Sequence, residues 1–225
     1  MYYDWHFERV LPYLGALLAG AWMTLKLTVT VVVIGGCVGT TLGRLLAKRR
    51  ARWFIVPAVD LFRSIPPLVL CLFFYYFLTV EVIGVTVARF WVFAIAMSCY
   101  MAAFTADIVR AAILSVPKEA VDAGVALGLS DAQVVRHISL SYVVRHATPG
   151  MSLLVITMLK TTSLASIVNV REVVYTAQAV LSQTARSLEV WVLVGIIYVV
   201  LVLPATYVAK KLELWARRGR QSLSE

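Results

Sequence analysis

Long apolar runs without charge constrain this chain more than any other feature. Five stretches of 17 to 24 residues contain at most one charged side chain: 27–43, 64–80, 90–106, 147–170 and 190–209. A helix that crosses the hydrocarbon core of a bilayer needs about 20 apolar residues, with a range of about 17–25. Strands of a membrane barrel would be shorter and would alternate with polar residues. The runs therefore predict five membrane-spanning helices.

The composition agrees with this interpretation. Hydrophobic residues make up 61% of the 225 residues and charged residues only 15%, with a mean hydropathy of +0.85. Soluble domains contain about 25% charged residues, so the soluble, disordered and disulfide-scaffold classes are excluded. We predict an all-α integral membrane fold in a single transmembrane domain, residues 1–225, with helices at about 17–47, 53–79, 88–113, 142–170 and 188–212.

The basic residues indicate how these helices are oriented. Of 21 Lys and Arg residues, 14 fall on one side of the predicted spans, in segments 44–52, 110–145 and 210–220. Cytoplasmic loops of membrane proteins carry such an excess of Lys and Arg. We therefore expect the N-terminus outside and the C-terminus in the cytoplasm. The same excess explains the net charge of +9, so the expected surroundings are the lipid bilayer and no nucleic-acid partner is expected.

Glycines in the first predicted helix repeat every four residues, at Gly35, Gly39 and Gly43. Small residues at this spacing let another helix approach closely. The pattern favours packing within the chain, and a contact between subunits is the alternative.

The segment between the third and fourth predicted helices predicts two short helices, at about 117–127 and 130–137. Pro117 suits the start of a helix, and Gly128 suits the left-handed position that ends one. Ser130 and Gln133 have the spacing of a capping box, which begins the second helix. The small side chains of the first helix allow a close approach to a partner: Ala120, Ala123, Gly124 and Ala126.

This cytoplasmic segment, residues 115–140, resembles the EAA loop of permeases in binding-protein-dependent ABC importers. The family pattern has an acidic residue, two alanines, Gly, Ile and Leu-Pro at fixed spacing. The spacing is preserved here at Asp122, Ala123, Gly124, Gly128, Ile138 and Leu140. Three positions depart from the pattern: Asp for Glu at 122, Gly for Ala at 124, and Ser141 for Pro.

Other motifs resemble the polar amino-acid subfamily of these permeases, namely Phe62-Arg-Ser-Ile-Pro66, Lys160-Thr-Thr-Ser-Leu164 and Glu172. The resemblance implies the permease fold of the type I importers, in the inner membrane of a bacterium. It implies a coupling helix within 115–140 that docks on a cytoplasmic ATP-binding subunit. A second permease, identical or related, and a periplasmic or extracellular amino-acid-binding protein are the other implied partners.

The chain contains no phosphate-binding loop of the form G-x-x-x-x-G-K-[S/T] and no H-E-x-x-H metal motif. We expect a non-catalytic subunit without a cofactor of its own. ATP and Mg²⁺ would be bound by the partner ATPase.

Lys160 is the polar residue that most needs an explanation, since a charge at the bilayer centre costs about 2.5–3.5 kcal/mol. Three hydroxyl residues follow it, and the candidate solute pathway comprises Lys160, Thr161, Thr162 and Ser163, with Arg63 and Ser64 as weaker candidates. The ammonium could contact a solute carboxylate. It could instead pair with a carboxylate on a neighbouring helix or reach the outer headgroups.

Two other functions compete with the importer permease. A gradient-driven secondary transporter or channel often has repeated halves and carboxylate relays inside the membrane, and the sequence has neither. A membrane scaffold without transport would leave Lys160 and the small-residue loop unexplained.

Overall fold

The computed structural model describes residues 3–48, 52–78 and 87–221, and these contain helices and no strand. The α-helices are α1 (Leu14–Leu46), α2 (Arg52–Ser64), α3 (Pro67–Leu78), α4 (Arg89–Leu114), α5 (Lys118–Ala126), α6 (Asp131–Gln133), α7 (Leu140–Thr161), α8 (Val173–Thr184) and α9 (Ser187–Gln221). The 3₁₀-helices are η1 (Phe7–Arg9), η2 (Leu11–Tyr13) and η5 (Thr162–Val168), and η4 (Val134–Ser139) is a π-helix.

The predicted all-helical membrane fold is confirmed. Among the described residues, four helical stretches are long and apolar enough to cross a membrane: Phe7–Leu46, Arg89–Leu114, Asp131–Val168 and Ser187–Arg217. The pair α2 and α3 makes a fifth candidate, broken between Ser64 and Pro67 where the sequence has two prolines. The basic residues Arg49 and Arg50 and the predicted end of the second span at residue 79 lie outside the described residues.

The chain divides into two compact units. Unit 1 comprises Met1–Val33, Ile65–Ser98 and Ile156–Ala205, and unit 2 comprises Ile34–Ser64, Cys99–Val155 and Thr206–Glu225. The long helices α1, α4, α7 and α9 each contribute to both units.

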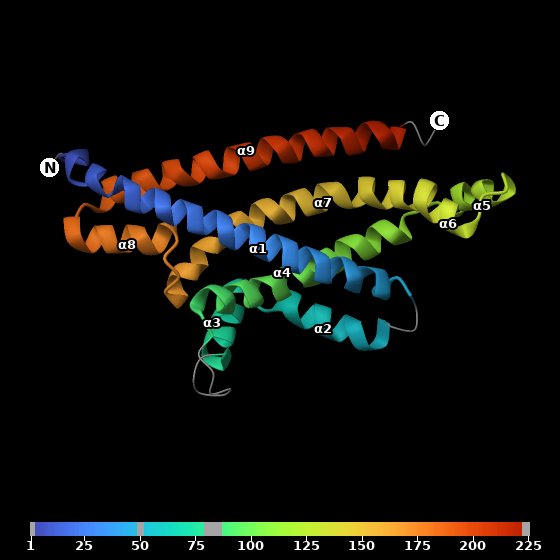
Figure 1. Cartoon of the computed structure of the whole chain (residues 1–225), viewed down its shortest axis with the longest axis horizontal. Coiled ribbons are helices and arrows are strands. Elements are labelled where there is room, and N and C mark those ends of the chain that lie inside the picture. Colours follow the sequence, from blue (N-terminus) through green and yellow to red (C-terminus); the bar gives the residue numbers. More distant parts are fainter. Residues whose placement is uncertain (1–2, 49–51, 79–86, 222–225) are drawn as a thin grey trace. The chain divides into compact units, whose positions relative to one another are not determined.

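The core of unit 1 joins α1, α8 and α9 (Figure 1). Apolar side chains of the three helices form one buried cluster, among them Leu17 from α1, Ala177 from α8 and Val194 from α9. Helix α8 lies in a stretch that the sequence predicts as a plain connection between the last two spans. Its buried residues Val173, Ala177 and Val180 have helical spacing, which holds α8 against its neighbours.

Unit 2 contains the close helix contact that the glycine repeat predicts. A Cβ atom at Gly39 would lie 2.5 Å from the Ala102 carbonyl oxygen of α4, and one at Gly43 would lie 2.7 Å from that of Ala106. No side chain fits at such distances, so α1 and α4 approach along a glycine face. For Gly39 and Gly43, the preferred interpretation of packing within the chain is confirmed.

Of the two short helices predicted between the third and fourth spans, the first forms as α5, and the second begins at Asp131 as predicted but does not end near residue 137, because it is continuous with the fourth span. Gly128 has φ of +80°, the left-handed conformation that ends α5. The backbone N–H of Ser130 donates to Gln133 Oε1 at 2.9 Å, which is one half of the predicted capping box. The helix then continues through η4 into α7.

Candidate functional site

Lys160 lies in the last turn of α7, where the α-helix changes to the 3₁₀-helix η5. The three hydroxyl side chains that follow bond to carbonyl oxygens of the preceding turn. Thr161 donates to Thr157 at 2.9 Å, Thr162 to Leu159 at 2.6 Å and Ser163 to Lys160 at 2.9 Å. Such bonds compete with the α-helical pattern, which explains why the helix tightens here.

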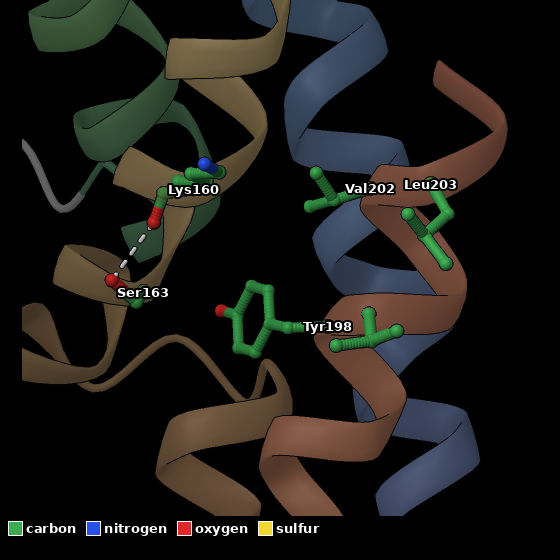
Figure 2. Close-up of a pocket in the computed structure, with 6 residues that line it drawn as sticks. Lys160, Ser163, Tyr198, Val202 and Leu203 are labelled. Atoms are coloured by element: carbon green, nitrogen blue, oxygen red, sulfur yellow. Dashed lines mark hydrogen bonds between the residues drawn. The ribbon is translucent and has the colours of Figure 1, made fainter. Parts of the chain in front are cut away.

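A cavity of about 410 Å³ opens beside this junction, within unit 1 (Figure 2). Its lining comprises Lys160, Ser163, Tyr198, Val199, Val202 and Leu203. The cavity thus combines one cation and two hydroxyls with an apolar wall from α9. Of the predicted pathway residues after the second span, Lys160 and Ser163 line it, whereas Thr161 and Thr162 do not, and Thr162 is buried.

The Lys160 ammonium has no carboxylate partner within the part of the chain that the structure describes. Three of the described arginines do have one: Arg63 lies 3.2 Å from Asp107, Arg110 lies 3.9 Å from the same carboxylate, and Arg186 lies 3.9 Å from Glu189. A cation in an apolar span that is left without a partner faces a large desolvation cost. The arrangement at Lys160 therefore suits an anionic group supplied from outside the chain.

Tyr198 lines this cavity and forms a polar pair with Glu172, which lies behind it, and neither residue was predicted to belong to the site. Tyr198 of α9 donates to Glu172 Oε2 at 3.4 Å. Glu172 is completely buried and caps α8 by accepting from the Tyr175 backbone N–H at 2.8 Å. Gly20 of α1 makes room for it, because a Cβ there would lie 3.0 Å from the Glu172 carbonyl. The position of Glu172 before an apolar helical pattern was the available signal.

Glu172 lies between η5 and α8, outside the helices that can cross the membrane. Burial raises the pKa of its carboxyl to about 7, although hydrogen bonds from backbone N–H groups and from Tyr198 act in the opposite direction. An unfolded chain releases this proton near pH 4.3. The folded state therefore holds the proton more tightly, and the associated stability is lost as the pH rises through about 7.

A Glu172→Gln variant should remove this pH dependence, since glutamine keeps an acceptor for the cap and never ionises. Melting temperatures of the detergent-solubilised proteins, measured from pH 5 to pH 8.5, test it. The wild type should lose stability relative to the variant as the pH rises. Glu119→Gln, on the exposed surface of α5, controls for general loss of a carboxylate. A constant difference between wild type and Glu172→Gln would contradict the prediction.

The weaker pathway candidates belong to unit 2. The Arg63 guanidinium contacts Asp107 at 3.2 Å and lies over the Phe104 ring at 5.3 Å, and Ser64 donates to the Asp60 carbonyl at 2.8 Å. The predicted pairs Asp60–Arg63 and Asp107–Arg110 both form, at 3.9 Å. Arg63 is thus engaged in joining α2 to α4.

The residues of the predicted coupling segment occupy two different places in unit 2. Gly124 is buried, and a Cβ there would lie 2.5 Å from Ile138 Cδ1, so it lets α5 pack on η4. Asp122 and Leu140 instead line a cavity of about 940 Å³ together with Arg44 and Lys118 of the same unit.

Part of the outer surface of the same segment is apolar. Leu127 is 82% exposed and Val125 is 54% exposed, next to the exposed Ala123 and Ala126. Gly124 therefore packs inside the segment, whereas Val125 and Leu127 form a surface that is available to a partner protein.

Residues 35–218 match the family model of the binding-protein-dependent transport system inner membrane component. The chain belongs to this family. The resemblance to permeases of binding-protein-dependent importers is thereby confirmed, and so is the assignment to the inner membrane.

Individual relatives agree with the family. The chain is 29% identical to the arginine transport system permease protein ArtQ of Bacillus subtilis, over 92% of this chain and 95% of ArtQ. It is 28% identical to the glutamine transport system permease protein GlnP of Escherichia coli, over 95% and 97% of the two chains. The octopine transport system permease protein OccM of Rhizobium meliloti is 32% identical, over 91% and 88%.

Solved structures support the same fold. A chain of an amino acid ABC transporter crystallised with histidines matches with a TM-score of 0.83 at 25% identity, over 97% of this chain and 100% of that one. A chain of the MetNI methionine ABC transporter matches with a TM-score of 0.72 at 21% identity, over 91% and 98%.

Proposed function

We propose that this chain is the membrane-spanning permease of an ATP-driven importer of polar amino acids. The observation that carries the proposal is the Lys160 ammonium, which lines a cavity and has no carboxylate partner among the described residues. Every amino acid offers a carboxylate that can fill this role. The relatives are named for the transport of arginine, glutamine and octopine, which agrees with an amino-acid substrate.

Coupling to ATP would occur at the apolar surface of α5. Leu127 and Val125 expose large side chains at a short helix between two spans, and an apolar surface outside the lipid is a mark of protein contact. A cytoplasmic ATPase is the partner that the EAA-like spacing supports. Nucleotide-driven movement of α5 would then reach α7 through η4, because Gly124 packs directly on Ile138.

The remaining parts of the proposal follow from the family. The N-terminus lies outside and the C-terminus in the cytoplasm, as the distribution of basic residues favours. Two permeases, identical or related, form the pathway, and an external solute-binding protein delivers the amino acid.

Uptake by a reconstituted complex tests the proposal. The permease, its ATPase and its receptor would be placed in liposomes, with labelled glutamine, glutamate and arginine supplied outside. We expect uptake of at least one amino acid that needs both ATP and receptor and that persists when ionophores remove all ion gradients. Uptake that does not require ATP and is abolished by the ionophores would instead support the gradient-driven alternative.

A further inference from the structure

The cavity at Lys160 has a second polar end, which the sequence motif does not include. Figure 2 shows the Tyr198 ring reaching from α9 toward Lys160 and Ser163, with its hydroxyl at the tip. The other α9 residues of the lining are Val199, Val202 and Leu203. The hydroxyl of Tyr198 is therefore the polar group that α9 offers to anything bound in the cavity.

The direction of the Tyr198 hydrogen bond decides what this hydroxyl can do. A phenol hydroxyl has one proton and two lone pairs. The proton is directed at Glu172 Oε2, 3.4 Å away. Thr24 and Thr162 also lie within hydrogen-bond reach of this hydroxyl, but their own protons are directed at the backbone carbonyls of Gly20, at 3.2 Å, and Leu159, at 2.6 Å. Because the Tyr198 proton is engaged at Glu172 and neither threonine donates to the phenol oxygen, that oxygen has lone pairs left for a donor in the cavity. An ammonium group is a donor and never an acceptor, so it is the chemical complement of Tyr198 in this arrangement.

Glu172 is held in place by more than Tyr198. Its carboxyl accepts from the Tyr175 backbone N–H at 2.8 Å, its carbonyl accepts from Thr176 at 2.9 Å, and it has no exposed surface. A solute in the cavity would therefore meet Tyr198 and not Glu172. The buried carboxyl can act on the solute only through the hydroxyl that it orients.

We propose that Tyr198 contacts the solute as the acceptor for its α-ammonium group and that Glu172 is the residue that positions Tyr198. Lys160, the cation of the same cavity, takes the α-carboxylate. The inference rests on the proposed function, because it requires an amino acid in the cavity. It extends that function by assigning recognition of the α-ammonium and the α-carboxylate to this chain. The apolar residues of α9 would then lie beside the side chain of the solute.

The proposed contact between the α-ammonium and Tyr198 can be tested by comparing amino acids with their desamino analogues. The pairs are glutamine and glutaramate, glutamate and glutarate, and arginine and 5-guanidinopentanoate, and each analogue keeps the carboxylate and lacks the α-ammonium. Binding would be measured on the permease–ATPase complex in nanodiscs, without receptor and at pH 8. The wild type should bind the best amino acid about 10-fold more tightly than its analogue, the scale of one hydrogen bond to a charged group.

Tyr198→Phe removes the hydroxyl and keeps the ring. It should weaken binding of the amino acid and leave binding of the analogue unchanged, so that the two affinities become equal. Tyr207→Phe makes the same change on an exposed tyrosine of α9 and should keep the wild-type preference. A preserved preference in Tyr198→Phe overturns the proposal, and so does a wild-type complex that binds both compounds equally or binds neither.

Glu172→Gln tests the positioning role and serves as the second variant if Tyr198→Phe does not assemble. It should reduce the preference, and the double variant should show no further loss beyond Tyr198→Phe. An additive loss would assign Glu172 a role independent of Tyr198 and overturn that part. The proposed function fails on a different result, namely the absence of ATP-dependent amino-acid uptake by the complete wild-type system.

Discussion

Leu127→Glu should abolish co-purification of the ATPase subunit with this chain. Leu127 is 82% exposed at the end of α5, so the substitution should change the stability of the isolated permease by no more than about 0.5 kcal/mol. In the proposed complex the same side chain would be covered by the ATPase. A buried carboxylate without a partner costs about 3–5 kcal/mol, which corresponds to a loss of affinity of about 100-fold or more.

Ala132→Glu is the matched control for this variant. It adds the same carboxylate to the same segment, on the exposed surface of α6, and should leave the complex intact. The measurement is affinity purification through a tag on the permease, followed by quantification of the ATPase and of its hydrolysis rate. An intact complex with Leu127→Glu would show that α5 does not dock through this surface.

The membrane spans, helix α5 and the start of α6 could be predicted from the sequence because each depends on local chemistry. The uncharged runs and the left-handed Gly128 each reflect a requirement that neighbouring residues determine. The glycine repeat of α1 predicted a close helix contact but did not identify α4 as the partner. Helix α8 was missed for the opposite reason. It is 12 residues long, too short to cross a bilayer, and it is stabilised by burial against α1 and α9, which are distant in sequence.

The residues of the candidate site also differ in whether the local sequence reveals them. Lys160 could be found because a charge inside an apolar run is conspicuous in the sequence alone. Tyr198 could not, since a tyrosine in an apolar helix has the same pattern whether it faces lipid, a neighbour or a cavity. Gly124 shows the intermediate case: its small size predicted a close contact, but the sequence could not distinguish a contact with Ile138 from one with a partner protein.

Lys160→Met should reduce uptake by about 100-fold or more in the reconstituted importer. The variant keeps an unbranched side chain, shorter by one atom, and removes the charge, so the carboxylate of the solute would enter the cavity without a partner, at a cost of about 3–5 kcal/mol. The permease itself should insert at least as well as the wild type, because an ammonium in a span costs about 2.5–3.5 kcal/mol. The variant should therefore lose uptake while its insertion and assembly are unimpaired.

Lys26→Met supplies the comparison that isolates the role of Lys160. Lys26 is also a lysine in a membrane-spanning helix, and its ammonium lies 5.5 Å from the Trp22 ring centroid and does not line the Lys160 cavity. Uptake and complex recovery should both stay close to the wild type. Normal uptake by Lys160→Met would remove Lys160 from the solute pathway, and an ammonium that reaches the outer headgroups would then be the better explanation. A selective loss in Lys160→Met, with its complex recovered in full, ties the cation to the transported carboxylate, because the two variants lose the same chemical group and differ only in position.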